Sequence, residues 1–251
     1  MAPQAPGGSS PPSTRKLQAL ALFEELPKRY DLVSATLSFG QDPRWRRALV
    51  SAVAPSHADH VLDVATGTGL VAAELVACGG CKVTGLDQSP QMLAAARARV
   101  AGDLALTDRV ELIEGEAEHL PFQANSFDAV TFTYLLRYVD DRGATLRELA
   151  RVVKPGGRIG MVEFGVPSQA QLRAFWRVYT RALMPLLGRI VSPAWFEVGR
   201  FLGPSIEDLY AREPDIGALW RACGIAEVNE QRPSFGAGLV MWGVRSDQRS
   251  A

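Results

Sequence analysis

The sequence predicts an α/β protein with a doubly wound, mostly parallel sheet of seven strands, preceded by N-terminal helices. Short apolar segments of strand length alternate with helical segments through the first two thirds of the chain. A turn with two glycines follows the first apolar segment, as expected where a parallel strand feeds a helix. The last two strand-like segments are separated by a short loop, which indicates an antiparallel pair at the sheet edge.

Composition predicts one domain. The 251 residues, 47% of them hydrophobic, suffice for one large core with a small accessory lobe. We expect a disordered tail over residues 1–13, rich in proline, glycine and serine, and a single domain over 14–246. The 27 basic and 27 acidic residues cancel, so no nucleic-acid partner is predicted. A signal peptide and an apolar run of eighteen residues are both lacking, which predicts a cytoplasmic protein.

The expected elements follow the chain in a regular order. A helical pattern runs from Lys16 to Pro27, and a second helix begins at Asp42-Pro43, interpreted as an N-cap acid and an N1 proline. The first of the five strands expected in parallel opens the stretch 61–69, and the others lie at 81–87, 110–114, 127–133 and 158–164. Helices are expected at about 69–78 and 141–153, and a K-P-G-G turn at 154–157. A helix at about 214–223 precedes the final pair at 226–231 and 238–244.

The turn in V-L-D-V-A-T-G-T-G, residues 61–69, predicts a ligand that contains adenosine. Gly67 and Gly69 permit positive φ and close approach to bare backbone, and the following helix offers unpaired N–H groups. The same glycines, with Ala72 and Asp87, also fit a dinucleotide fingerprint. An acid inside the apolar strand favours S-adenosylmethionine instead, because Asp63 could receive its ammonium group. The alternative for Asp63 is a buried acid tied to a backbone donor.

Asp87 ends the second expected strand, at the sheet edge where ligands bind in open α/β folds. A carboxylate there can accept both hydroxyls of a ribose. The alternative is an N-cap for the helix that begins at Ser89-Pro90.

A helical insertion or lid is expected at about 167–212. No acid occurs from Phe164 to Phe196, whereas four arginines do: Arg173, Arg177, Arg181 and Arg189. The first three recur every four residues and would form a basic stripe on one helix. With its many aromatic residues, the insertion could wall a pocket for an apolar acceptor. The alternative is an ordinary amphipathic helix packed on the domain.

Five motifs together resemble the ubiquinone and menaquinone biosynthesis C-methyltransferases, a class I S-adenosylmethionine-dependent family. They are Y-D-L-V-S-A-T-L-S-F-G at 30–40, the glycine turn, E-A-E-H-L-P-F at 116–122, F-D-A-V-T-F-T-Y-L-L-R-Y-V at 127–139, and K-P-G-G through E-F at 163–164. The terminal reversed hairpin is also typical of the methyltransferase form of the fold. The resemblance implies that Thr68 binds the cofactor in the turn, Asp87 the ribose, Glu116 and the Ala117 amide the adenine, and Thr133 the methionine.

The chain departs from that family at several positions. Ala65 stands where the wider class often has glycine, and Glu116 where a shorter acid or amide is usual. Ser34 and Tyr138 occupy positions where the family usually has asparagine, and Leu135 replaces a glycine. Because the segment at 135–138 faces the acceptor in the family, these changes predict a different pocket shape.

The predicted reaction is methylation of a ring carbon in a quinol or phenol. Arg137 is the candidate catalytic residue, polarising the acceptor oxygen; its alternative role is an ion pair with Asp140 or Asp141. We find no clustered ligands for magnesium and expect no metal. A prenylated acceptor would bring the basic insertion to an anionic membrane. The sequence does not decide between a monomer and a homodimer. The alternative functions are a soluble tailoring methyltransferase for a small phenol or polyketide and, in another class, a dinucleotide oxidoreductase or a non-catalytic cofactor-binding module.

Overall fold

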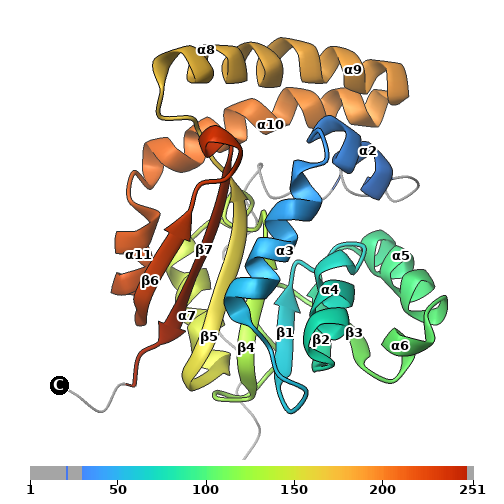
Figure 1. Cartoon of the computed structure of the whole chain (residues 1–251), viewed down its shortest axis with the longest axis vertical. Coiled ribbons are helices and arrows are strands. Elements are labelled where there is room, and N and C mark those ends of the chain that lie inside the picture. The colour runs from blue at the N-terminus through green and yellow to red at the C-terminus, as the bar shows by residue number, and fades with distance from the viewer. Residues whose placement is uncertain (1–20, 22–29, 248–251) are drawn as a thin grey trace, which may run out of the picture.

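A seven-stranded sheet forms the centre of the computed structural model, which describes Ala21 and residues 30–247 (Figure 1). The strands are arranged in the order β3-β2-β1-β4-β5-β7-β6, and β7 is antiparallel to both of its neighbours. This is the predicted fold. The expected tail and nearly all of the first expected helix lie outside the described residues. The strands are β1 (His60–Val64), β2 (Lys82–Asp87), β3 (Val110–Glu114), β4 (Phe127–Thr133), β5 (Val153–Phe164), β6 (Ile225–Gln231) and β7 (Gly238–Arg245).

Helices cover both faces of the sheet and bury two apolar cores. On one face α3 (Gln41–Val53) and α4 (Leu70–Gly79) enclose a core that includes Trp45 and Leu75. On the other, α7 (Arg142–Val152) and α11 (Ile216–Ala222) enclose a core that includes Leu149 and Trp220. The helices α5 (Pro90–Ala101) and α6 (Leu104–Thr107) lie beside β2 and β3 (Figure 1).

Two predicted boundaries were wrong. The helix α3 begins at Gln41 with Gly40 as its N-cap, so Asp42 lies within the first turn and is not the N-cap. The strand β5 begins at Val153, five residues before the expected start, because Val153 pairs with Phe127. The register then shifts, and the K-P-G-G residues are accommodated as an irregularity between that pair and the next.

The insertion forms a roof above the carboxyl ends of the strands (Figure 1). It consists of α8 (Ala170–Val178), a π-helical turn (Tyr179–Leu183), α9 (Met184–Val191) and α10 (Pro193–Arg212). Pro185 provides a reason for the π turn: it donates no N–H, and its ring would clash with the Arg181 carbonyl in a regular α-helix. No helix within the described residues is long and apolar enough to span a bilayer.

The helix α2 (Tyr30–Leu37) lies between the roof and the sheet. Its buried residues Val33 and Leu37 belong to a third apolar core with Trp176, Trp195 and residues of α10. This arrangement places α2 beside both cavities described below.

Candidate active site

The glycine turn after β1 has the backbone that a bound nucleoside requires. Gly67 and Gly69 adopt φ of 56° and 79°. A Cβ on Gly67 would meet no protein atom within 4 Å, and Gly67 lines a cavity, called here the cofactor cavity. A Cβ on Gly69 would instead approach Ala96 at 3.4 Å, and Gly69 is not in the wall. The two predicted glycines therefore have different roles: Gly67 leaves room for a ligand, and Gly69 permits the turn to pack on α5.

Ala65 also lies in the left-handed region, with φ of 54°. This conformation costs a residue with a Cβ about 1–2 kcal/mol. Ala65, which replaces the glycine common in the wider class, is therefore a strained residue in the cofactor turn.

Asp87 lies at the end of β2 and lines the cofactor cavity. Its Oδ2 accepts from the Gly67 amide at 2.8 Å and its Oδ1 from the Ser89 amide at 2.9 Å. Burial raises the pKa of this carboxyl, opposed by the backbone donors. The N-cap alternative was wrong, because Ser89 caps α5 by accepting from the Met92 amide. Asp87 instead fixes the glycine turn from the cavity wall, and its contact with a ribose stays a prediction.

Asp63 is fully buried in β1 and does not line the cofactor cavity. Its carboxylate accepts from the hydroxyls of Thr66 at 2.6 Å and Thr131 at 2.7 Å. Burial raises the pKa of Asp63 to about 6. The geometry thus resembles the buried-acid alternative, with hydroxyl rather than backbone donors. Direct contact with an ammonium group stays a prediction, and Thr66 is the residue that connects Asp63 to the cavity wall.

The remaining predicted cofactor residues divide into two groups. Thr68, Ala117 and Thr133 line the cavity. Glu116 is exposed and does not, whereas Glu118, which sequence reasoning missed, does. A backbone bridge between Glu116 and His119 closes a tight turn here, and the two residues within it, Ala117 and Glu118, are the ones that line the cavity.

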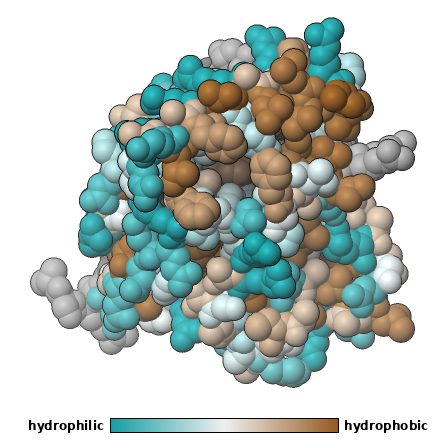
Figure 2. Space-filling view, turned by 45° about the horizontal axis from the view of Figure 1, so that its top comes forward, coloured by the Kyte–Doolittle hydropathy of each residue, from teal (hydrophilic) through white to brown (hydrophobic). Residues whose placement is uncertain are grey.

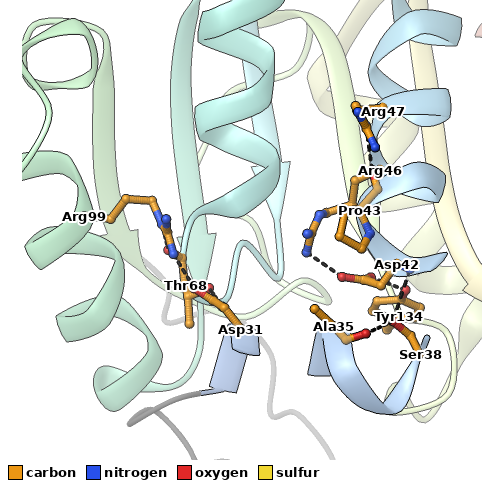
Figure 3. Close-up of polar contacts among 10 residues, drawn as sticks. All are labelled: Asp31, Ala35, Ser38, Asp42, Pro43, Arg46, Arg47, Thr68, Arg99 and Tyr134. Atoms are coloured by element: carbon orange, nitrogen blue, oxygen red, sulfur yellow. Dashed lines mark hydrogen bonds and ion pairs between the residues drawn. The ribbon is translucent and has the colours of Figure 1, made fainter. Parts of the chain in front are cut away.

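A polar cluster fastens α2 over the cofactor turn (Figure 3). Asp31 accepts from the Thr68 hydroxyl at 2.6 Å and forms an ion pair with Arg99 of α5. Arg99 also donates from Nε to the Thr68 carbonyl at 2.8 Å. Sequence reasoning missed Asp31, although it lies in a motif that carried the family resemblance.

A second, largely apolar cavity of about 630 Å³ lies under the roof. Residues of α2, α8, α9 and α10 contribute to its wall. Four residues line both cavities and define what we call the junction: Tyr30, Ser34, Tyr134 and Tyr138. Two of them, Ser34 and Tyr138, are departures from the family pattern, so these departures lie where the two cavities meet.

Arg137 lines the apolar cavity but is only 1% exposed. Its Nε donates to Glu163 Oε1 at 2.8 Å, and its Nη1 donates to the Ser205 hydroxyl at 3.1 Å. The guanidinium carbon lies 4.9 Å from the centre of the Tyr138 ring. Burial raises the pKa of Glu163, and the adjacent cation only partly offsets this.

The acid paired with Arg137 is therefore Glu163, and not one of the two neighbours considered from the sequence. Asp141 instead caps α7 by accepting from the Ala144 amide at 2.8 Å. An acid at the end of the apolar segment R-I-G-M-V-E-F was a signal that could have identified this partner.

Tyr134 and Asp42 form another pair that the sequence did not suggest (Figure 3). The Tyr134 hydroxyl donates to Asp42 Oδ1 at 2.5 Å, and Arg46 lies 2.7 Å from Oδ2. Asp42 is 3% exposed. The N-cap interpretation concealed this residue because Asp-Pro is a common helix start.

Together the walls fit S-adenosylmethionine. Bare backbone at Gly67, a carboxylate at the end of β2 and an apolar wall at Leu86 and Ala117 suit an adenosine with a charged substituent. The sequence model of the ubiE/COQ5 methyltransferase family matches residues 13–245 of this chain. The chain belongs to this family. It is a methyltransferase that uses S-adenosylmethionine, as the sequence predicted.

Similar proteins agree with that assignment. The chain is 38% identical to a demethylmenaquinone methyltransferase of Clavibacter sepedonicus, with 93% of each chain covered. It is 36% identical to a ubiquinone/menaquinone biosynthesis C-methyltransferase of Desulfotalea psychrophila, with 89% of each covered. A methyltransferase structure from Aquifex aeolicus has the same fold, with a TM-score of 0.57 at 19% identity over 80% of this chain and 89% of that one.

Proposed function

We propose that this enzyme methylates a ring carbon of a quinol that carries an apolar side chain, with demethylmenaquinol as the acceptor. The observation that carries the proposal is the apolar cavity and its junction with the cofactor cavity. A flat ring at the junction would meet three tyrosines, and an apolar chain would extend beneath the roof. The curated names of the relatives support the same acceptor.

The cosubstrate supplies a methyl group as an electrophile on a positively charged sulfur. The protein has to align the ring carbon with that methyl and exclude water. We assign cofactor binding to Gly67, Thr68, Asp87, Ala117 and Thr133 in the wall. Asp63, Gly69 and Glu116 lie behind it or outside it, and we assign them to supporting the turn and loop.

We also propose that Arg137 stabilises negative charge on the acceptor oxygen. Its Nε is paired with Glu163 at 2.8 Å, and the ring centres of Tyr134, Tyr138 and Phe164 all lie within 6 Å of the guanidinium carbon. A cation held in an apolar wall has a stronger electrostatic effect than one in water. Its field therefore reaches the junction, although its side chain is buried.

The mouth of the apolar cavity supports contact with a membrane. Three phenylalanines that line this cavity are also strongly exposed: Phe39, Phe175 and Phe235. Further exposed apolar side chains follow along the roof at Val178, Leu186 and Ile190. Figure 2 shows hydrophobic surface at the upper right of that view, where α9 lies in Figure 1. A prenylated quinol could therefore enter from lipid.

The expected basic stripe contributes less charge than the sequence suggested. Arg177 and Arg181 both form ion pairs with Glu207 of α10, which lies outside the acid-free segment. The π turn also interrupts the helix that was to carry the stripe. Apolar contact should therefore outweigh charge in membrane attachment.

The acceptor is tested by transfer of labelled methyl groups into reduced demethylmenaquinone and into a panel of water-soluble phenols. Turnover of the quinol far above that of every phenol is expected. A preference for a soluble phenol would contradict the proposal and favour the tailoring alternative.

Membrane contact is tested by sedimentation with vesicles. We expect binding to anionic vesicles that Ile190→Glu weakens, because the change places charge on the apolar roof. Leu104→Glu is the matched control, since Leu104 is equally exposed but lies on α6. Equal binding by both variants, or a dimer in light scattering that Ile190→Glu dissociates, would contradict membrane contact.

A further inference from the structure

Tyr134 occupies a backbone conformation that needs an explanation. Its φ is 58°, in the left-handed region that bulky side chains rarely adopt. The amide donates to the Val162 carbonyl at 2.8 Å, and the ring stacks on Phe164 with centroids 4.6 Å apart. Such strain persists only where the surroundings fix it, and it concentrates at functional sites. The conformation carries the Tyr134 side chain to the junction.

The hydroxyl of Tyr134 has a buried proton acceptor. Asp42 receives its hydrogen bond at 2.5 Å and is held from the other side by Arg46. The charged groups that face Tyr134 are Asp42 and Arg46 on α3, Glu163 on β5, and Arg137, whose guanidinium carbon lies 5.8 Å from the ring centre. Burial and the adjacent carboxylate raise the pKa of Tyr134 well above its ordinary value. Tyr134 is therefore a neutral hydroxyl whose proton is already directed at Asp42.

We propose that Tyr134 and Asp42 form the proton relay for ring methylation, an inference that rests on the proposed function. Tyr134 is the catalytic residue that contacts the acceptor hydroxyl, and Asp42 acts through it. A carbon nucleophile made from a quinol needs such a group, because loss of the hydroxyl proton strengthens the attacking carbon. Arg137 provides charge but, as an arginine, does not accept the proton.

The relay balances in protons and electrons. The acceptor hydroxyl transfers its proton to Tyr134 Oη while the Tyr134 proton moves to Asp42 Oδ1. The electron pair released from the O–H bond flows into the ring, whose carbon bonds to the methyl group as the methyl–sulfur bond breaks toward sulfur. The ring then loses its C–H proton to solvent and its oxygen regains a proton through the same relay. One proton is released overall, and Asp42 returns to its carboxylate form.

The test compares acceptors of different acidity. With reduced demethylmenaquinone at pH 7, Tyr134→Phe and Asp42→Asn should each lower kcat by about 10²- to 10⁴-fold, the usual contribution of general base catalysis. With a ring-halogenated phenol that ionises near neutral pH, the loss should shrink to less than about tenfold, because the proton has already left. Tyr210→Phe is the matched control: its hydroxyl donates to the Phe164 carbonyl at 2.9 Å, and it lines neither cavity.

Calorimetry with S-adenosylhomocysteine accompanies each variant, so that loss of folding or cofactor binding is separated from loss of the relay. Wild-type kcat in Tyr134→Phe, or an equal loss on both acceptors, would overturn the relay while leaving the proposed function standing. Failure of the unmodified enzyme to methylate any quinol or phenol would overturn the proposed function itself.

Discussion

Replacing Gly67 with alanine tests whether the open space at the turn belongs to the cofactor. The added Cβ meets no protein atom, so the cost to the folded chain is confined to the positive φ. A left-handed alanine costs about 1–2 kcal/mol, and the stiffer unfolded chain returns about 0.5–1 kcal/mol. The free energy of unfolding should therefore fall by no more than about 1.5 kcal/mol.

The effect on the ligand should be larger than the effect on stability. The new methyl group would occupy cavity space, and overpacking of this kind costs about 1–3 kcal/mol, or about a 5- to 150-fold loss of affinity. The Gly67 amide still donates to Asp87, so the turn itself is retained. Calorimetry with S-adenosylhomocysteine measures the affinity, and urea titration measures the stability.

Gly156→Ala is the matched control for that experiment. Gly156 has φ of 76° and equally open surroundings, yet it lines neither cavity. It should lose the same stability without losing affinity. Equal ligand affinities in the two variants would refute the assignment of the space at Gly67.

Three further outcomes follow from buried charge. Asp87→Ala should lower affinity for S-adenosylhomocysteine by about 2 kcal/mol in calorimetry, because charge-assisted bonds to the ribose and to two backbone amides are lost together; unchanged affinity would remove Asp87 from the ribose. Burial in the folded state raises the pKa of Asp63 to about 6, so the free energy of unfolding should fall by about 3 kcal/mol as the pH rises from about 3 to about 7. Asp63→Asn should lack that decline in urea titrations, and an unchanged profile would contradict the burial argument. Arg137→Leu should lower the free energy of unfolding by about 3–5 kcal/mol, because it leaves the Glu163 carboxylate buried without its cation. Adding Glu163→Gln should recover stability but not turnover. Recovered turnover would make Arg137 purely structural.

The fold could be predicted because its signals are local. The strands β3 and β4 have the predicted bounds, since each is an apolar segment flanked by polar turns. The start of β5 could not be predicted, because it depends on pairing with Phe127 across a register shift. Likewise, a π turn imposed by Pro185 breaks a repeat that the sequence presents as one helix.

The wall of the cofactor cavity was predictable where its residues are close together in the sequence. Gly67 and Asp87 lie 20 residues apart within one strand-helix-strand unit, and the motif carries their spacing. Asp42 and Tyr134 are 92 residues apart and meet only through the packing of α3 on the sheet. Local reasoning therefore assigned Asp42 to a helix start and sought the partner of Arg137 among its neighbours.

The helix α2 connects the two ligands mechanically. Asp31 holds it to the cofactor turn, while its Leu37 carbonyl accepts from the Tyr179 hydroxyl in the roof. Tyr30 and Ser34 on the same helix line both cavities. The first ligand to bind bears the free-energy cost of ordering α2, and the second ligand then binds without that cost. Cofactor and acceptor should therefore bind with positive cooperativity. By linkage the effect is reciprocal: the acceptor tightens the cofactor by the same factor by which the cofactor tightens the acceptor.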